Sequence, residues 1–163
     1  KTIILPNFMN FPNQATICYL INENEELLLQ YKRKGFGKGK WNGPGGKIET
    51  GETPRECVKR EVWEETGIRI IEAELKGELE FIFPDNPKNN FYSYVFVSRK
   101  FQGDPEDTEE GELRWFYRKD LPWKDMWDDD RYWLYEVLEG NFVRKRFYFK
   151  KDGNVDSFCN IKN

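Results

Sequence analysis

From residue 46 to residue 68 the chain reads GKIETGETPRECVKREVWEETGI, and this stretch decides the fold. Thr53 is a good N-cap for a helix, Pro54 suits the first helical position, and Glu56 completes a capping box with the threonine. Gly67 is the expected C-cap, because glycine readily adopts the left-handed conformation in which many helices end. The stretch therefore predicts a loop and then a helix that runs from Pro54 to the residue before Gly67.

The predicted helix carries three acidic residues on one side. Successive helical residues are about 100° apart, so Glu61 and Glu65 lie roughly 40° from each other, with Glu64 about 60° to the other side. Val58 and Val62 flank this ridge and are expected to dock the helix on a sheet. Like charges at these spacings destabilise a helix, so the three carboxylates need compensation.

Two kinds of compensation are open to the acidic ridge. Arg60 can reach Glu64 one turn away, but one arginine does not neutralise three carboxylates. A hard divalent cation with oxygen ligands would do so. The alternative is a solvated acidic helix face, and the three glutamates taken alone favour that interpretation.

The absence of histidine narrows the chemistry. It excludes Ser-His-Asp and Cys-His catalysis, and it excludes zinc or iron sites that depend on histidine ligands. A general base must then be a carboxylate, a lysine or a metal-bound water. A metal site would be built mainly from oxygen atoms, which favours Mg²⁺ or Mn²⁺.

The composition predicts a folded protein of one domain. The 163 residues are 38% apolar and 34% charged, with a net charge of −3, which argues against a non-specific binder of nucleic acid or membranes. No run is long enough for a transmembrane helix, and Lys1 to Pro12 does not resemble a signal peptide. Three widely spaced cysteines predict reduced thiols and a cytoplasmic location.

Apolar and alternating runs predict the remaining elements. Strands are expected at residues 15–21, 26–32, 68–73, 75–83, 91–101, 113–117 and 142–150, with a last short strand after a turn at Asp152-Gly153. The first two strands are expected to form a hairpin through the turn at residues 22–25. A second helix is expected from Asp128 to Glu139, with four apolar residues facing inward: Trp133, Leu134, Val137 and Leu138. This pattern predicts a single α/β (α+β) domain over residues 1–163.

The complete spacing of the opening stretch matches G-x5-E-x7-R-E-U-x-E-E-x-G-U, where U is a bulky apolar residue. In this it resembles the signature of the Nudix hydrolase superfamily, of the MutT type, which covers 23 of the 163 residues. The resemblance implies a mixed β-sheet between helices, with the signature as a loop–helix–loop. It also implies a hydrolase that acts on nucleoside diphosphates linked to another group.

The resemblance assigns roles to the signature residues. Glu61 and Glu65 are implied as principal ligands of Mg²⁺ or Mn²⁺, and Glu64 as a ligand or the general base. The carbonyl of Gly45 is implied as a further ligand. Arg60 would orient the glutamates, with Glu52 behind it, and Glu110 is the acid expected to join the site from the later loop. For Glu110 the alternative is a solvated loop residue.

Beyond the signature, residues 16–149 resemble the animal-type oxidised purine nucleoside triphosphatases (8-oxo-dGTPases), most specifically at residues 32–37, 40–43 and 122–130. The resemblance implies that four residues hold the purine: Asn42, Trp127, Asp129 and Asp130. It maps five residues to the pocket wall: Thr16, Lys32, Phe36, Phe81 and Phe91. The alternatives are that Trp127, Phe81 and Phe91 belong to the core and that one aspartate caps the second helix. Asp128 stands where proline is common, and Phe91 where methionine is usual.

These expectations add up to metal-dependent hydrolysis of oxidised purine triphosphates to the monophosphate and pyrophosphate, a nucleotide-pool function linked to DNA repair. The runner-up substrates are ordinary nucleotides or nucleotide sugars, and a silent nucleotide-binding module is the non-enzymatic alternative. The intact carboxylates speak against that module. The expected partner is a small nucleotide and not a nucleic-acid polymer or a membrane, with the protein as a monomer or homodimer.

Overall fold

The structure is a computed structural model that describes residues 11–162. The prediction about a signal peptide falls mainly on residues outside this range. The strands are β1 (Asn13–Leu20), β2 (Glu26–Lys32), β3 (Trp41–Asn42), β4 (Arg69–Ile82), β5 (Phe91–Gln102), β6 (Gly111–Tyr117), β7 (Val143–Phe149) and β8 (Val155–Asn160). The helices are α1 (Pro54–Thr66) and α2 (Leu134–Leu138), with 3-10 turns η2 (Pro87–Asn89), η3 (Arg118–Asp120), η4 (Trp123–Asp125) and η5 (Asp128–Tyr132).

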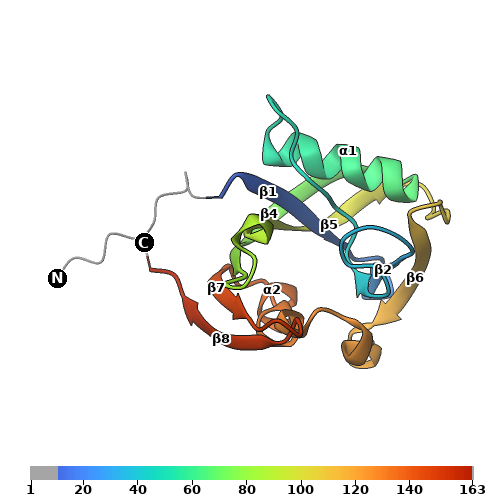
Figure 1. Ribbon diagram of the computed structural model, residues 1–163. Helices are drawn as coiled ribbons and strands as arrows, with labels where there is room; N and C mark the ends of the chain where they lie inside the picture. The colour runs from blue at the N-terminus through green and yellow to red at the C-terminus, as the bar shows by residue number, and fades with distance from the viewer. Residues whose placement is uncertain (1–10, 163) are drawn as a thin grey trace.

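The strands form two sheets, and the predicted mixed α+β architecture is confirmed (Figure 1). The larger sheet has the order β1-β5-β4-β7-β8, with parallel β1–β5 and β4–β7 pairs, and the smaller one has the order β3-β2-β6. The predicted hairpin of the first two strands is wrong, because β1 pairs in parallel with β5 and only one bridge, Ile21 to Leu27, links the two segments. Both faces of β1 are buried from Ile17 to Leu20, which is typical of parallel strands.

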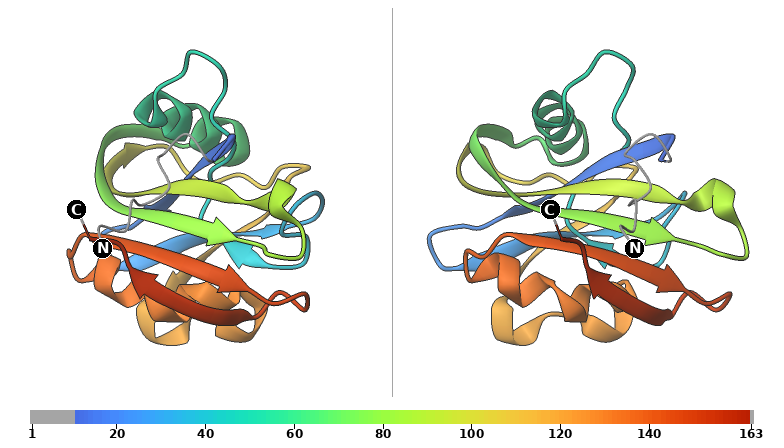
Figure 2. Two further views of the ribbon diagram at one scale, coloured as in Figure 1. Left: turned by 60° about the vertical axis from the view of Figure 1, so that its left-hand side comes forward. Right: turned by 90° about the vertical axis from the view of Figure 1, so that its left-hand side faces the viewer.

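The layers follow from the alternation of side chains along β1. Figure 2 shows α1 on one side of the sheets and α2 with the turns η3, η4 and η5 on the other. Cys18 and Leu20 pack with Val58 and Val62 of α1 in one core, whereas Tyr19 packs in a second core with α2. The predicted docking of α1 through its two valines is therefore confirmed, as is the burial of the four apolar residues predicted for the second helix.

The other differences from the sequence predictions are local. β4 is one strand, with register shifts against β5 where two strands were predicted. The predicted second helix is divided into η5 and α2, because Trp133 between them has φ −143° and ψ −23°, outside the helical range. Neither aspartate caps a helix, since Trp127 and Trp133 stand at the two N-cap positions and no side chain caps there.

The three cysteines are free thiols. Cys18 and Cys57 are buried in the α1 side of the molecule, and Cys159 is exposed on β8. Burial raises the pKa of the Cys57 thiol to about 11. Within residues 11–162, no helix has the length and apolar character needed to span a membrane.

Candidate active site

The loop between β3 and α1 (residues 43–53, hereafter the box loop) is fixed at both of its ends. It lies along β1, where Thr16 N–H donates to the Gly46 carbonyl at 2.8 Å and Ala15 forms a bridge with Lys47. At the start of α1 the predicted capping box is present, with Glu56 N–H donating to Thr53 Oγ1 at 3.1 Å. At the end of α1, Gly67 adopts φ 76° as the predicted C-cap. These contacts hold the acidic side of α1 against the box loop.

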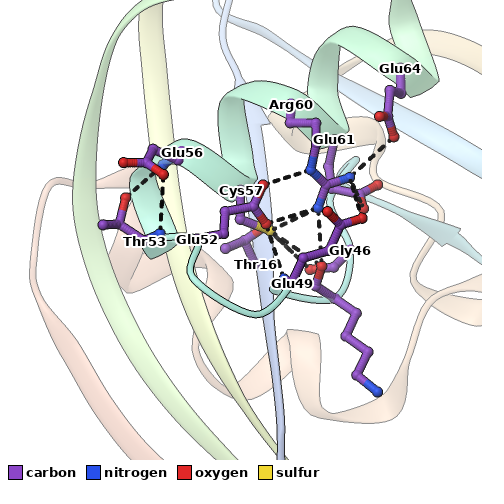
Figure 3. A network of polar contacts seen from close by, with 11 residues as sticks. Thr16, Gly46, Glu49, Glu52, Thr53, Glu56, Cys57, Arg60, Glu61 and Glu64 are labelled. Atoms are coloured by element: carbon purple, nitrogen blue, oxygen red, sulfur yellow. Dashed lines mark hydrogen bonds and ion pairs between the residues drawn. The ribbon is translucent and has the colours of Figure 1, made fainter.

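Arg60 is the centre of the polar network on α1 (Figure 3). Its Nε and Nη2 donate to the two oxygens of Glu52 at 2.7 and 2.9 Å, and this pair lowers the pKa of Glu52 to about 2. Its Nη1 donates to Glu61 at 2.9 Å and to Glu64 at 3.2 Å, so the contact expected one turn away exists. A further bond reaches the Lys47 carbonyl at 3.2 Å. One guanidinium thus fixes two carboxylates of the ridge and the box loop together.

Glu65 lies apart from that network and is 7% exposed. Its carboxylate accepts a hydrogen bond from Gly45 N–H at 3.2 Å. Burial raises its pKa to about 8, and the nearby charges of Glu61 and Glu110 add to the rise, while Lys32 opposes it. A negative charge on Glu65 is therefore unfavourable unless a cation compensates for it.

Two glycines let the box loop approach its neighbours. A Cβ on Gly45 would lie 2.1 Å from the Thr16 carbonyl oxygen, and a Cβ on Gly46 would lie 2.5 Å from the carboxyl carbon of Glu61. Backbone atoms leave no room for a side chain at Gly45, and a side chain at Gly46 would displace the Glu61 carboxylate. The backbone at Gly46 consequently lies directly beside the Glu61 carboxylate.

Glu110 reaches the site from the loop that precedes β6. This loop lies against the end of α1, where Glu106 N–H donates to the Thr66 carbonyl at 2.9 Å and the Thr108 hydroxyl meets the Glu65 carbonyl at 3.5 Å. The side chain of Glu110 is 45% exposed and lies 3.9 Å from Lys34. Its charge contributes to the raised pKa of Glu65, so the loop that precedes β6 lies near the carboxylates of α1.

The donors suit a hard divalent cation. Within residues 11–162, no three acidic, cysteine or histidine side chains converge as a ready metal site. The available groups are nevertheless all oxygen donors, namely the carboxylates of Glu61, Glu64, Glu65 and Glu110 and the Gly45 carbonyl. A cation there would offset the repulsion around the buried Glu65, which carboxylates alone leave uncompensated.

A cavity of about 150 Å³ adjoins the box loop. It is lined by every residue that the resemblance assigned to substrate binding: Thr16, Lys32, Phe36, Asn42, Phe81, Phe91, Trp127, Asp129 and Asp130. Gly45 and Gly46 line the same cavity. The structure thus brings together side chains from β1, β2, β3, β4, β5 and η5 beside the carboxylates of α1.

The two aspartates of the cavity are buried and differ in their partners. Asp129 accepts a hydrogen bond from Trp133 Nε1 at 2.7 Å, whereas Asp130 Oδ2 has no partner. Burial raises the pKa of both carboxyls, and the charge of Asp129 raises that of Asp130 further. The pair therefore retains a proton on Asp130 more firmly than on Asp129. This geometry excludes the alternative in which an aspartate is a solvated helix cap.

Aromatic rings form the rest of the wall. Phe36 lies 5.0 Å from Trp127 between ring centroids, and Phe81 stacks on Phe91 at 4.6 Å. Trp127 is half-buried and stands outside both cores, so it is not a plain core residue. Phe81 belongs to the α2-side core and to the cavity wall at once.

The sequence missed two polar residues near these aspartates. Gln30 is buried opposite Asn42, and its Nε2 has no partner. The sequence feature that could have indicated its role is a single amide residue that follows the apolar run of β2. Lys40 lies over the Trp127 ring at 5.5 Å and opposes the rise in the pKa of Asp130.

Comparisons with known proteins identify the family of this chain. A family model described as the NUDIX domain matches residues 11–137. The chain is 32% identical over 139 residues to the oxidized purine nucleoside triphosphate hydrolase of Mus musculus, which covers 85% of this chain and 88% of that protein. It is 33% identical over 146 residues to the protein of the same name from Danio rerio, which covers 88% of this chain and 90% of that one.

A solved structure shows the same fold. The crystal structure of the mutator MutT protein from Bacillus halodurans superposes with a TM-score of 0.80 at 28% sequence identity. The superposition covers 90% of this chain and 96% of that protein. The match therefore extends well beyond the signature stretch.

Proposed function

The chain belongs to the Nudix family of hydrolases, and we propose that it hydrolyses oxidised purine nucleoside triphosphates such as 8-oxo-dGTP to the monophosphate and pyrophosphate. The observation that carries this proposal is the shared cavity. The nine base-pocket residues and the two box-loop glycines line one space, so a base bound there has its phosphates beside the carboxylates of α1. The names of the relatives from mouse and zebrafish point to the same substrate class.

The chemistry requires charge stabilisation more than a strong nucleophile. Water attacks the phosphate chain, the anhydride bond between the α- and β-phosphates breaks, and pyrophosphate leaves. Nudix hydrolases generally use divalent metal ions, and Mg²⁺ or Mn²⁺ bound by Glu61, Glu65 and the Gly45 carbonyl would neutralise phosphate charge. Glu64 and Glu110 are the further carboxylates proposed for this site.

Arg60 has a positioning role in this proposal. Its bonds to Glu52 and the Lys47 carbonyl fix the guanidinium, and its Nη1 then sets the directions of Glu61 and Glu64. Lys32 lies close enough to act on Glu65 and can meet a phosphate oxygen.

The aspartate pair would read the purine edge. The protonated carboxyl of Asp130 can donate to a ring acceptor such as O6, while the ionised Asp129 accepts from N1–H or the exocyclic amine. Exchange of the proton between them presents the opposite pattern, so the pocket would accept both oxidised guanine and oxidised adenine. Asn42 would add an amide contact, with Trp127 against the ring.

A substrate panel tests the proposal. It comprises oxidised and normal purine and pyrimidine triphosphates together with ADP-ribose, each assayed with Mg²⁺, with Mn²⁺ and with EDTA. The expected result is the highest kcat/KM for an oxidised purine triphosphate, with monophosphate and pyrophosphate as products and no turnover in EDTA.

The variants Glu61→Gln and Glu65→Gln test the proposed metal ligands. Each removes one charged oxygen donor and should lower kcat on the order of a hundredfold or more, with an unchanged circular dichroism spectrum. Preference for ordinary nucleotides or ADP-ribose, release of orthophosphate alone, or near-wild-type turnover by either variant would overturn the proposal.

A further inference from the structure

A second cavity, of about 390 Å³, continues from the base pocket away from the aspartates. The two spaces share five lining residues: Ala15, Lys32, Phe36, Gly46 and Phe91. The second space adds five more: Asn13, Gln14, Lys47, Lys88 and Asn89. A ligand that fills the base pocket and passes Gly46 therefore enters this second cavity next.

Three lysines from separate parts of the chain line the second cavity. Lys32 ends β2, Lys47 lies in the box loop, and Lys88 lies in η2 before β5. The box loop pairs with one edge of β1, and β5 pairs with the other edge. The backbone of the box loop therefore lies roughly 10 Å from that of β5. The flexible four-carbon stems of lysine can span that gap and meet at one anion.

The three ammonium groups have no carboxylate partner within 4.0 Å among residues 11–162, although four other lysines of that range do. Like charges around one space repel each other, and a bound polyanion would remove that repulsion. The whole protein carries a net charge of −3, so a cationic cavity beside the acidic ridge runs against its overall charge. The cavity thus suits a ligand that is more negative than the protein around it.

The loop that carries Lys88 is held in place. Asn13 Nδ2 donates to the carbonyl of Lys88 at 3.0 Å and to that of Asn90 at 3.4 Å. The side chain of Asn90 in turn accepts a bond from Phe83 N–H at 2.7 Å. The backbone at Lys88 is therefore fixed at the cavity rim, while its ammonium group is exposed.

We propose that this cavity binds the terminal phosphates of the nucleotide, the part that leaves as pyrophosphate, and that Lys88 determines the preference for triphosphates over diphosphates. The inference rests on the proposed function. Lys32, which acts on the buried Glu65, serves the phosphate at the carboxylates. Lys47 and Lys88 serve the phosphates beyond it, and a diphosphate is too short to engage Lys88 fully.

Binding of inorganic pyrophosphate tests the subsite without any base. Isothermal titration with Mg²⁺ present is expected to give a dissociation constant that rises about three- to fivefold in Lys88→Ala and recovers in Lys88→Arg. Lys119→Ala removes one exposed lysine outside both cavities and should leave the constant unchanged. Equal binding by wild type and Lys88→Ala, or an equal loss in Lys119→Ala, would overturn the assignment.

A kinetic comparison tests the specificity role. For one nucleoside, the ratio of kcat/KM for the triphosphate to that for the diphosphate should fall about three- to fivefold in Lys88→Ala, with the loss in KM and not in kcat. An unchanged ratio means that Lys88 does not sense phosphate number. If pyrophosphate binding depends on Lys88 but the protein does not hydrolyse oxidised purine triphosphates, the subsite is supported and only the proposed function is contradicted.

Discussion

Asp129 and Asp130 are adjacent in sequence, but only Asp129 has a fixed hydrogen-bond donor, Trp133 Nε1. If the pair reads the base by exchanging a proton, Asp129→Asn fixes one donor–acceptor pattern. The variant should therefore change the ratio of kcat/KM for oxidised guanine to that for oxidised adenine triphosphates severalfold, instead of lowering both equally. Measurement of both constants checks this, and an unchanged ratio with unchanged rates would mean that the aspartates do not read the base.

The same pair predicts a pH dependence of stability. The pKa of Asp130 is raised far above its unfolded value of about 3.9, because the folded state buries the carboxyl beside Asp129. The stabilisation from holding its proton is fully present below the unfolded pKa and is lost as the pH rises toward the folded pKa. Asp130→Asn has no carboxyl proton to lose at this position. The free energy of unfolding of the variant should therefore rise relative to that of the wild type between pH 5 and pH 8, by at most about 1.4 kcal/mol per pH unit.

Urea denaturation at pH 5, 6.5 and 8 measures this difference. The exposed Asp125→Asn serves as the control and should follow the wild type at every pH. Parallel curves for Asp130→Asn and the wild type would show that the folded state does not hold a proton at this position.

At the scale of elements, Asp128 links η5 to β8. Asp128 accepts a bond from Val155 N–H at 2.8 Å at the start of β8, and it pairs with Arg131 at 2.9 Å. Asp128→Ala frees η5 from β8 and should lower the free energy of unfolding by about 1–2 kcal/mol. It should also raise KM more than it lowers kcat, because η5 carries the aspartates that we propose to read the base. Arg131→Ala keeps the strand contact and should change neither value much, so equal effects of the two variants would contradict this role.

The elements also show which features the sequence could predict. Each cap of α1 is a local feature of the sequence, so Thr53, Glu56 and Gly67 determined its bounds. The pairing of Asn13 with Phe91 joins distant residues, and no local pattern shows it, so the first strand was assigned to the wrong neighbour. Periodicity also missed the break at Trp133.

The candidate site residues were predicted from a resemblance to a known family. The signature supplied the carboxylates of α1, and the resemblance beyond it supplied the nine residues that line one cavity. Gln30 lay outside any motif, and Lys40 lay in the stretch 40–43 without a role assigned to it. Only the fold brings them to Asn42 and Trp127. The roles of all these residues stay predictions until the variants are measured.

For the whole molecule, the larger sheet is joined between β4 and β7 by charged pairs. Glu80 pairs with Arg146 in register, and their side chains are only 8% and 13% exposed. Glu80→Gln leaves the buried Arg146 without its counter-charge and should lower the free energy of unfolding by about 3 kcal/mol. The exposed pair of Glu25 with Arg99 is the matched control, and Glu25→Gln should cost less than about 1 kcal/mol. Similar losses in both variants by urea denaturation would contradict the difference in burial.

The unequal burial of the three thiols provides a built-in reporter of unfolding. A maleimide dye should label the native protein once, at Cys159, because Cys18 and Cys57 lie inside the α1-side layer. Full denaturation makes all three sulfur atoms reactive. The mass added per chain therefore counts how much of that layer has opened, and pulsed labelling could follow it in crude extracts without an enzyme assay.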